Sequence, residues 1–227
     1  MENYPMRINK YLALKGISTR RGADVLIESG KVFINGKKAK LGDKVGESDK
    51  VDVKGLEKQK YVYFAYNKPI GVQTEDIIER MPKLKTAGVF PVGRIDKASH
   101  GLMLLTNDGR ITDRLLNPKF EHEKGYDVRV KGHLRSSFKD KMEKGVNIEG
   151  YQTKPCKVEI LDVDKFRVTL TEGKKHQIRR MCVALFQEVA ELKRIRVMNI
   201  KLGDLKQNQT REITGTELEK FLSLLQL

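Results

Sequence analysis

The chain has 227 residues, 39% of them hydrophobic, and a formal net charge of +15 from 45 lysines and arginines against 30 acidic residues. This length allows a substantial core in one or two domains, and the charge favours a polyanionic partner over a merely solvated surface. Cys156 and Cys182 lie in unrelated segments, which predicts a reduced chain without a structural zinc site. No segment resembles a signal peptide or a membrane span, so we expect a soluble, cytoplasmic protein with no membrane partner.

Residues 1–54 form the first predicted domain, with two short helices followed by a hairpin. Apolar residues at helical spacing in RINKYLALKG predict the first helix, which Gly16 ends. Ser18 or Thr19 is suited to cap the second helix. The alternation in KVFINGKKAKL predicts two strands joined at Asn35-Gly36, a pair that tolerates the positive φ angles of a tight turn.

Basic residues crowd this first domain, and between residues 7 and 40 only Asp24 and Glu28 oppose them. The cluster is either a solvated face or a phosphate-contacting surface, and its one-sidedness favours the second. The stretch RINKYLALKGISTRRGADVLIESGKVFINGK resembles the S4 RNA-binding domain. That resemblance implies RNA contacts from Arg7, Lys10, Arg20, Arg21, Lys31, Lys37 and Lys38.

Residues 55–60 are polar and charged and are predicted to be a linker to a second domain, residues 61–227. A strand in YVYFAYNKPIGV is expected to open this domain and to end at a Pro-Gly turn. Strands and helices then follow without a regular βαβ period, which predicts an α+β fold with a mixed, largely antiparallel sheet flanked by helices. The expected strands are 102–106, 126–130, 156–161, 166–171, 189–192 and 198–201, and the expected helices are 110–116, 135–144, 174–185 and 215–224.

Several common catalytic motifs are missing from the sequence. It contains no GxxxxGK[ST] phosphate loop, no dinucleotide-type glycine fingerprint, no HExxH and no GxSxG. The four histidines never pair at helical metal-ligand spacing. These observations argue against a nucleotide-driven enzyme or a hydrolase of a familiar kind.

Asp96 is the first candidate for chemistry, in the stretch GRIDKASHGLMLLTNDG. It follows the glycine-started turn at Gly93 and precedes an apolar run that predicts a buried strand. Arg94 and Lys97 favour its charged form, which suits a nucleophile or base better than a general acid. A lone aspartate in a turn more often bonds its own backbone, so this stretch alone leaves both interpretations open.

Two further stretches contain candidate residues. HEKGYDVRV places Tyr126 at the start of a strand, where its ring faces either the core or a cleft. TEGKKHQIRRMCVALF leads through a Gly-Lys-Lys turn into a helix with Arg179 and Arg180 in its early turns. The helix start is either a basic, solvated turn or an arginine aimed at a carboxylate or phosphate, which its planar fork binds bidentately.

Together the three stretches, in this order behind an S4-like domain, resemble the catalytic core of the RsuA-like family of pseudouridine synthases. RIRVMNIKLGDL and TREITGTEL resemble the same family, although Ile95 and Ser99 stand where it commonly has leucine and threonine. RIRVMN resembles most the members that act on large-subunit (23S) rRNA, the F-type in particular.

The resemblance implies that Asp96 is the catalytic aspartate, which attacks the ribose of a target uridine or starts its elimination. Uracil is then detached at N1, rotated and rejoined through C5, so no metal, nucleotide or redox cofactor is implied. It further implies that Tyr126 stacks on the base, that Arg179 pairs with Asp96 and that the protein is a monomer acting on ribosomal RNA. Further substrate and RNA contacts are implied for Arg94, Lys174, Lys175 and Arg180.

Two other functions compete with this one. A non-catalytic S4-type RNA-binding or ribosome-assembly protein would share the first domain but would not need Asp96, Tyr126 and Arg179 together. A carboxylate-based glycosidase or nuclease would need a second carboxyl group. Asp108 lies near Asp96 in the sequence, but capping of the following helix explains it. The target stays open among 23S rRNA, 16S rRNA and tRNA.

Overall fold

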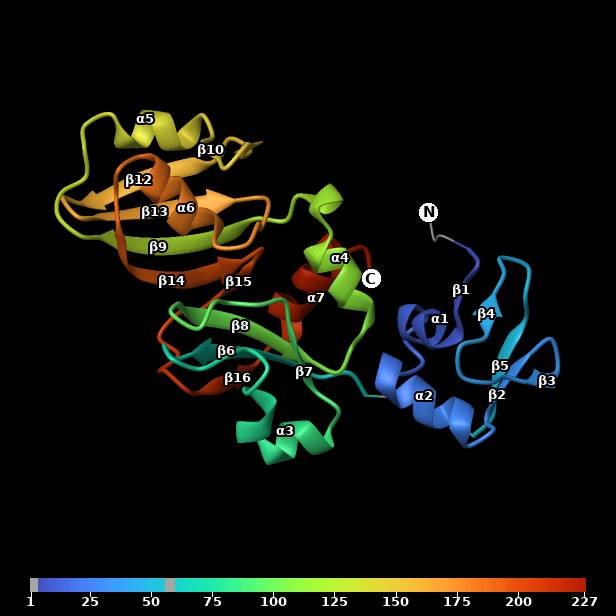
Figure 1. The fold of residues 1–227 in the computed structure, drawn as a ribbon. Helices are drawn as coiled ribbons and strands as arrows, with labels where there is room; N and C mark the ends of the chain where they lie inside the picture. The colour runs from blue at the N-terminus through green and yellow to red at the C-terminus, as the bar shows by residue number, and fades with distance from the viewer. Residues whose placement is uncertain (1–3, 56–59) are drawn as a thin grey trace.

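The computed structural model describes residues 4–55 and 60–227, so part of the predicted linker, 56–59, lies outside the described residues. The N-terminal unit, blue in Figure 1, has the predicted order of two helices followed by a hairpin. Its elements are β1 (Met6–Arg7), α1 (Ile8–Leu14), α2 (Arg20–Glu28), β2 (Val32–Ile34), β3 (Lys37–Lys38), β4 (Lys44–Val45) and β5 (Val51–Val53).

Local sequence features account for this unit. Gly16, with φ +69°, follows the end of α1, and the Thr19 hydroxyl accepts the Gly22 N–H at 3.0 Å to cap α2. Asn35 and Gly36 both have positive φ and join the antiparallel pair β2–β3, as predicted. The buried residues form a small core that includes Ile8, Leu12, Ala23, Ile27 and Val32.

The second unit is built on one large sheet with helices on its faces (Figure 1). Within the described residues this sheet has nine strands in the order β12-β13-β9-β14-β8-β6-β16, with β15 beside β14 and β7 beside β8. The strands are β6 (Tyr63–Lys68), β7 (Phe90–Val92), β8 (His100–Thr106), β9 (Lys124–Val130), β12 (Lys157–Asp162), β13 (Lys165–Leu170), β14 (Val189–Val197), β15 (Ile200–Lys201) and β16 (Thr210–Glu212).

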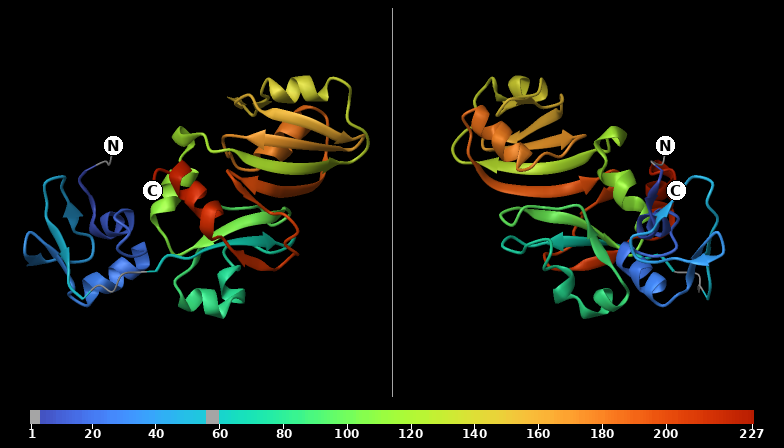
Figure 2. Two further views of the ribbon diagram at one scale, coloured as in Figure 1. Left: turned by 180° about the vertical axis from the view of Figure 1, so that it is seen from behind. Right: turned by 45° about the vertical axis from the view of Figure 1, so that its right-hand side comes forward.

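Within its described residues, the second unit has three buried apolar clusters, one on the half of the sheet formed by β9, β12, β13 and β14 and two on the half formed by β6 and β8. The helical segments are η1 (Ile78–Arg80), α3 (Pro82–Thr86), α4 (Arg110–Leu116), η2 (Pro118–Phe120), α5 (Phe138–Glu143), α6 (Gln177–Ala184) and α7 (Gly215–Leu224). Helices α5 and α6 pack their apolar residues on the half formed by β9, β12, β13 and β14, whereas α4 and α7 pack on the half formed by β6 and β8. Figure 2 shows this division from two further directions. The predicted α+β fold is confirmed.

The two halves meet where β8 and β14 run parallel, in a sheet whose other pairings among the described strands are antiparallel. His100 and Gly101 of β8 pair there with Lys193 and Arg194 of β14. Gly101 has φ +104°, and a Cβ at this position would lie 2.3 Å from the Arg194 carbonyl oxygen. Only glycine allows this approach, so Gly101 holds the junction beside which the Asp96 loop ends.

Some predicted boundaries are wrong. Only the second half of the strand expected at 198–201 is a strand, β15, because Met198 has φ +50° and the chain reverses at residues 198–199 between β14 and β15. Helix α6 begins at Gln177 instead of residue 174, because its side chain accepts the Lys174 N–H and fixes the preceding residues as a turn. Strand β14 extends to Val197, five residues beyond its predicted end, and α5 spans only Phe138–Glu143 of the helix predicted at 135–144.

Candidate active site

The loop of residues 93–99 carries Asp96 between β7 and β8. Gly93 turns the chain with φ +78°, and every residue of the following strand is buried, as the sequence predicts. The backbone fixes the loop from within, because the Ser99 N–H donates to the Asp96 carbonyl at 2.9 Å. The Asp96 side chain itself is 37% exposed and free to meet a ligand.

A neighbouring segment, residues 71–74, braces the same loop. The Thr74 hydroxyl donates to the Ile95 carbonyl at 3.1 Å and accepts the Ile95 N–H at 3.2 Å. The Gly71 N–H donates to the Lys97 carbonyl at 2.8 Å. Both residues adjacent to Asp96 are therefore tied to another part of the chain, which holds the carboxylate in one place.

Asp96 opens into a cavity of about 810 Å³ between the two halves of the sheet. Tyr126, half-buried on β9, lies in the wall, and its ring also packs against the core beneath α6. The exposed side chains of Arg94, Lys174 and Lys175 line the cavity as well. The structure thus places four predicted site residues around the carboxylate, in a space large enough for a nucleotide.

The predicted ion pair between Arg179 and Asp96 is wrong. Arg179 donates to the Ala98 carbonyl at 3.0 Å and to the Ser99 hydroxyl at 3.1 Å. Because Arg179 lies in the first turn of α6, it stands opposite the end of the loop, two residues beyond the carboxylate. The side chain that approaches the Asp96 carboxylate is His176, with its Nε2 3.5 Å from Oδ1. Arg179 therefore holds the loop instead of the reacting group.

Arg180 does not line the cavity, and its predicted contact with RNA stays a prediction. Its guanidinium donates to the Ile148 carbonyl at 3.1 Å and to Glu149 Oε2 at 2.7 Å, on the small hairpin of β10 (Asn147–Ile148) and β11 (Tyr151–Gln152). Adjacent residues on a helix diverge by about 100°, which explains why the two arginines reach different parts of the molecule.

The contrast between these arginines gives a first prediction. We expect Arg179→Ala to reduce turnover by more than about tenfold, because the Asp96 loop loses two hydrogen bonds. Arg180→Ala removes only an exposed ion pair and one carbonyl contact and should retain most of the activity. Single-turnover rates of the two variants on the same rRNA fragment make the comparison. Equal losses would show that both arginines serve a shared RNA-binding role.

Lys68 is a site residue that the sequence analysis missed. It is fully buried at the end of β6, and its ammonium donates to the carbonyls of Pro69 and Val72 at 3.1 and 2.7 Å. Burial lowers the pKa of Lys68 to about 8, and the nearby Asp96 carboxylate partly opposes that shift. A buried cation thus lies behind Asp96. The available signal was a lysine inside an otherwise apolar strand, directly before a Pro-Ile-Gly turn.

Two more cations border the cavity, again without a sequence signal: Lys124 is half-buried and Arg194 is buried. Lys124 lies two residues before Tyr126 on β9 and donates to the His122 carbonyl at 3.2 Å. Burial lowers its pKa to about 8, and the charge of Arg194 adds to the shift. Arg194, 5% exposed, donates to the Leu102 carbonyl at 2.7 Å. These charges make the cavity floor electropositive, which suits an anionic ligand.

The far wall of the cavity is the turn of residues 171–176, and a buried carboxylate fixes it. Glu172 accepts hydrogen bonds from the Tyr151 hydroxyl and the Gln177 amide, both at 2.6 Å, and from the Lys154 N–H at 3.0 Å. The ammonium Nζ of Lys174 lies 4.4 Å from the centre of the Tyr151 ring. The turn that presents the basic residues is therefore preorganised instead of freely solvated.

Asp108 belongs to a separate, structural cluster. It is fully buried, accepts the Arg110 N–H at 3.0 Å at the start of α4, and also accepts two bonds from the Arg110 guanidinium. The Tyr63 hydroxyl donates to it at 2.6 Å. Its predicted role at the helix start is confirmed, and Asp108 does not line the cavity that holds Asp96.

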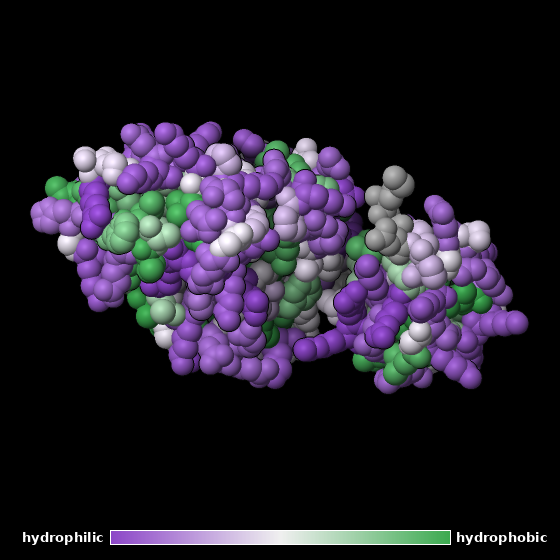
Figure 3. Space-filling model, turned by 45° about the horizontal axis from the view of Figure 1, so that its top comes forward, coloured by the Kyte–Doolittle hydropathy of each residue, from purple (hydrophilic) through white to green (hydrophobic). Residues whose placement is uncertain are grey.

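The basic residues predicted for the N-terminal domain lie on its surface. Lys10 is half-buried and the other six are exposed, and the visible face of this domain in Figure 3 is largely hydrophilic. Across residues 4–55 and 60–227 no group of three or more histidine, cysteine or carboxylate side chains could hold a metal ion. Over the same residues no helix has the length and apolar character needed to cross a membrane.

A carboxylate on a braced loop, an aromatic ring and a rim of cations define an enzyme of polyanionic substrates, behind a basic helix-helix-hairpin domain. The family model for RNA pseudouridylate synthase matches residues 52–184, and the S4 domain model matches residues 6–51. The chain is 40% identical over 97% of its length to the dual-specificity RNA pseudouridine synthase RluF of Escherichia coli K12, of which it covers 80%. The chain therefore belongs to the RNA pseudouridine synthase family.

Further comparisons agree with this assignment. Ribosomal large subunit pseudouridine synthase B of Bacillus subtilis strain 168 is 36% identical, with 96% of each chain covered. A crystal structure of a pseudouridylate synthase superposes with a TM-score of 0.72 at 29% identity, covering 95% of this chain and 99% of the other. The predicted family, fold and enzyme class are confirmed.

Proposed function

We propose that this protein converts a specific uridine of ribosomal RNA, in the 23S molecule, to pseudouridine, with Asp96 as the catalytic aspartate. The observation that carries the proposal is the geometry of Asp96. Its loop is tied on both sides, and its carboxylate faces a cavity lined by Tyr126 and by cations. The named relatives that act on RNA, one of them on the large ribosomal subunit, support the choice of substrate.

The site residues divide the reaction among them. A uridine in folded RNA must leave its stack to reach the cavity, at a cost of a few kcal/mol that stacking on Tyr126 and the basic rim offset. Asp96 attacks C1′ of the ribose or starts the elimination, and the C1′–N1 bond breaks. The uracil rotates and forms the C1′–C5 bond, which releases Asp96, and the proton lost from C5 is balanced by the one that N1 gains. Arg94, Lys174 and Lys175 bind the surrounding phosphates, while Arg179 keeps the loop in place. Substrate and product contain the same atoms.

The domains share this task. Residues 1–54 bind RNA as the S4 domain, 55–60 connect, and 61–227 carry out catalysis, in a monomer that works in the cytoplasm. The pairing of β5 with β2 and of β6 with β8 supports these boundaries, because neighbouring strands on either side of the linker belong to different sheets. Arg7, Lys10, Lys31, Lys37 and Lys38 supply phosphate contacts together with Arg20 and Arg21.

Mapping pseudouridine directly tests the proposal. Unmodified rRNA is incubated with the full chain, treated with carbodiimide and scanned for reverse-transcription stops. We expect one or a few new stops in 23S rRNA. Stops in 16S rRNA or tRNA alone would show that the substrate is that RNA and not 23S rRNA. Tight binding without any stops would favour a non-catalytic RNA-binding protein.

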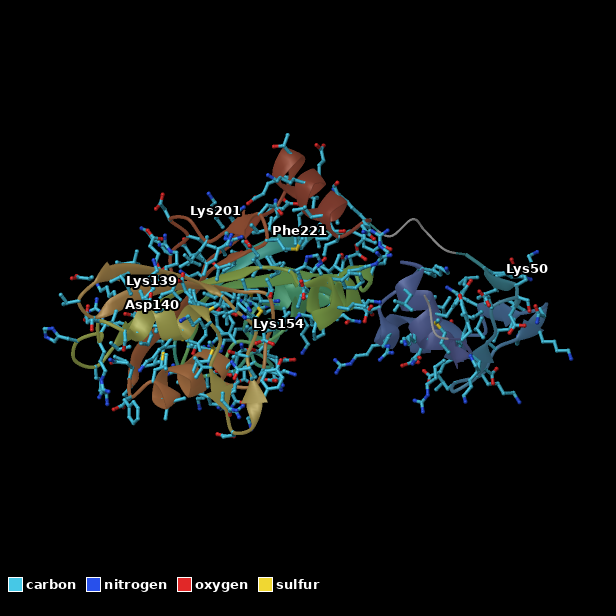
Figure 4. All side chains as sticks on the ribbon, turned by 90° about the horizontal axis from the view of Figure 1, so that it is seen from above. Lys50, Lys139, Asp140, Lys154, Lys201 and Phe221 are labelled. Carbon is cyan, nitrogen blue, oxygen red and sulfur yellow. The ribbon has the colours of Figure 1, made fainter. Side chains whose placement is uncertain are left out.

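The S4 domain gives a second prediction. Arg20 and Arg21 are exposed in the first turn of α2, so the double substitution Arg20→Ala/Arg21→Ala should weaken rRNA binding and lower the slope of log K against log salt by about 1 to 2. Lys50→Ala is the matched control, because Lys50 lies at the outer end of this domain in Figure 4 and pairs with Asp52 at 3.7 Å. An unchanged slope in the double variant would remove α2 from the RNA interface.

A further inference from the structure

Phe186 has a left-handed backbone conformation that usually favours glycine. It directly follows Leu185, the C-cap residue of α6, with φ +60°. This left-handed position after a helix favours glycine, because a side chain there is strained. Burial usually compensates such strain, yet Phe186 is 76% exposed and so has little packing to gain. A locally unfavourable residue without a packing role indicates a function at the surface.

A guanidinium group accompanies the exposed ring. Arg135, from the loop between β9 and α5, lies 5.0 Å from the centre of the Phe186 ring. A hydrogen bond from the Gln187 amide to the His133 carbonyl, 3.1 Å long, fixes this loop beside the end of α6. The pair of an aromatic ring and a guanidinium is therefore held in place by the surrounding chain.

The surroundings of the ring are basic. Between residues 131 and 144 five lysines and arginines stand against two acidic residues. Figure 4 places Lys139 of this segment at the end of the molecule opposite the S4 domain. Figure 3 shows that apolar side chains also reach the surface of this half of the molecule, among hydrophilic ones.

We propose that Phe186 and Arg135 form a second RNA-contact site, in which an unpaired base of the substrate RNA stacks on the exposed Phe186 ring. Base stacking on aromatic side chains and on arginine is a common mode of single-strand recognition, and nearby cations bind the flanking phosphates. An apolar protein surface fits less well, because it would bury the four lysines between residues 131 and 144 and would offer no partners for their charges. This inference rests on the proposed function in one respect, that the ligand is RNA.

Substitutions of Phe186 in the full chain test the site. Phe186→Gly should weaken binding to protein-free rRNA roughly 5- to 150-fold, the range for loss of one stacked base. The same variant should be at least as stable as the unsubstituted protein, because glycine relieves the strained φ. Phe186→Trp should retain the affinity, since it keeps an aromatic face. Val163→Ser, at another exposed apolar position, is the control and should bind normally.

Crosslinking identifies the occupant. A photoreactive benzoyl-phenylalanine at position 186 should crosslink to an unpaired nucleotide of rRNA. Normal rRNA binding by Phe186→Gly, or crosslinks only to a second copy of the chain or to another protein, would overturn the proposal. The two proposals fail separately. Activity that persisted in an Asp96 variant would refute the proposed mechanism, whereas the RNA-binding role of Phe186 depends only on the affinity of Phe186→Gly.

Discussion

Asp96→Asn is expected to abolish pseudouridine formation while leaving RNA affinity equal to or above that of the unsubstituted protein. The amide is nearly isosteric, and the contacts that hold the loop run through the backbone of Asp96 and through its neighbours, so the fold should survive. Asparagine is neither a nucleophile nor a base under these conditions. The rate of pseudouridine formation should fall by more than about 10²- to 10⁴-fold, which is the effect of removing a general base alone.

The binding half of this prediction follows from charge. Removing a carboxylate from a cavity lined by Arg94, Lys174 and Lys175 makes the site more positive, which favours the RNA backbone. Single-turnover assays on rRNA fragments, paired with filter binding, measure both quantities. Near-normal activity in Asp96→Asn would overturn the catalytic assignment.

The structure decides which aspartate is the right control. Asp108→Asn would break a buried cluster with Arg110 and Tyr63 and would confuse a folding defect with a catalytic one. Asp113 is exposed on α4 and does not line the cavity. Asp113→Asn should therefore have normal activity and normal stability, and any loss there would show that the assay responds to general changes in charge.

Lys68→Met is expected to reduce turnover about ten- to a hundredfold without a comparable loss of stability. The variant removes the buried cation whose charge interacts with the Asp96 carboxylate, and with it part of the preorganised electrostatic environment of the reacting group. Methionine also ends the cost of burying a charge, although the Pro69 and Val72 carbonyls lose their donor. The melting temperature at pH 7 should therefore stay within about 4 °C of the parent or rise.

The pH dependence of stability separates this explanation from a packing effect. The pKa of Lys68 is about 8 in the folded protein and near 10.5 when unfolded. The unfolded chain thus holds more protons between these values, and the stability of the parent rises with pH through this window. Lys68→Met lacks this contribution, so the parent should gain stability relative to the variant from pH 8 to 10. A constant difference across that range, or full activity in Lys68→Met, would contradict the role assigned to Lys68.

Local features of the chain were predictable from sequence because neighbouring residues determine them. The hairpin at Asn35-Gly36, the Thr19 cap and the turn at Gly93 each depend on a few consecutive residues and on their φ preferences. The order of the motifs also identified the family and marked Asp96 and Tyr126. The structure then brought both residues to one cavity.

The partners of the catalytic loop depended on tertiary structure. Gly101 and Arg194 pair although 92 residues lie between them in the sequence, and this parallel register determines where the loop meets α6 and β6. Periodicity reports which face of an element is buried, but it does not report which distant side chain lies opposite. The family resemblance implied Arg179 as the partner of Asp96, and periodicity could not test that pairing. Only the tertiary structure showed that Arg179 binds the loop backbone. It also showed that Lys68 is buried behind the Asp96 carboxylate and that His176 contacts this carboxylate from the cavity side.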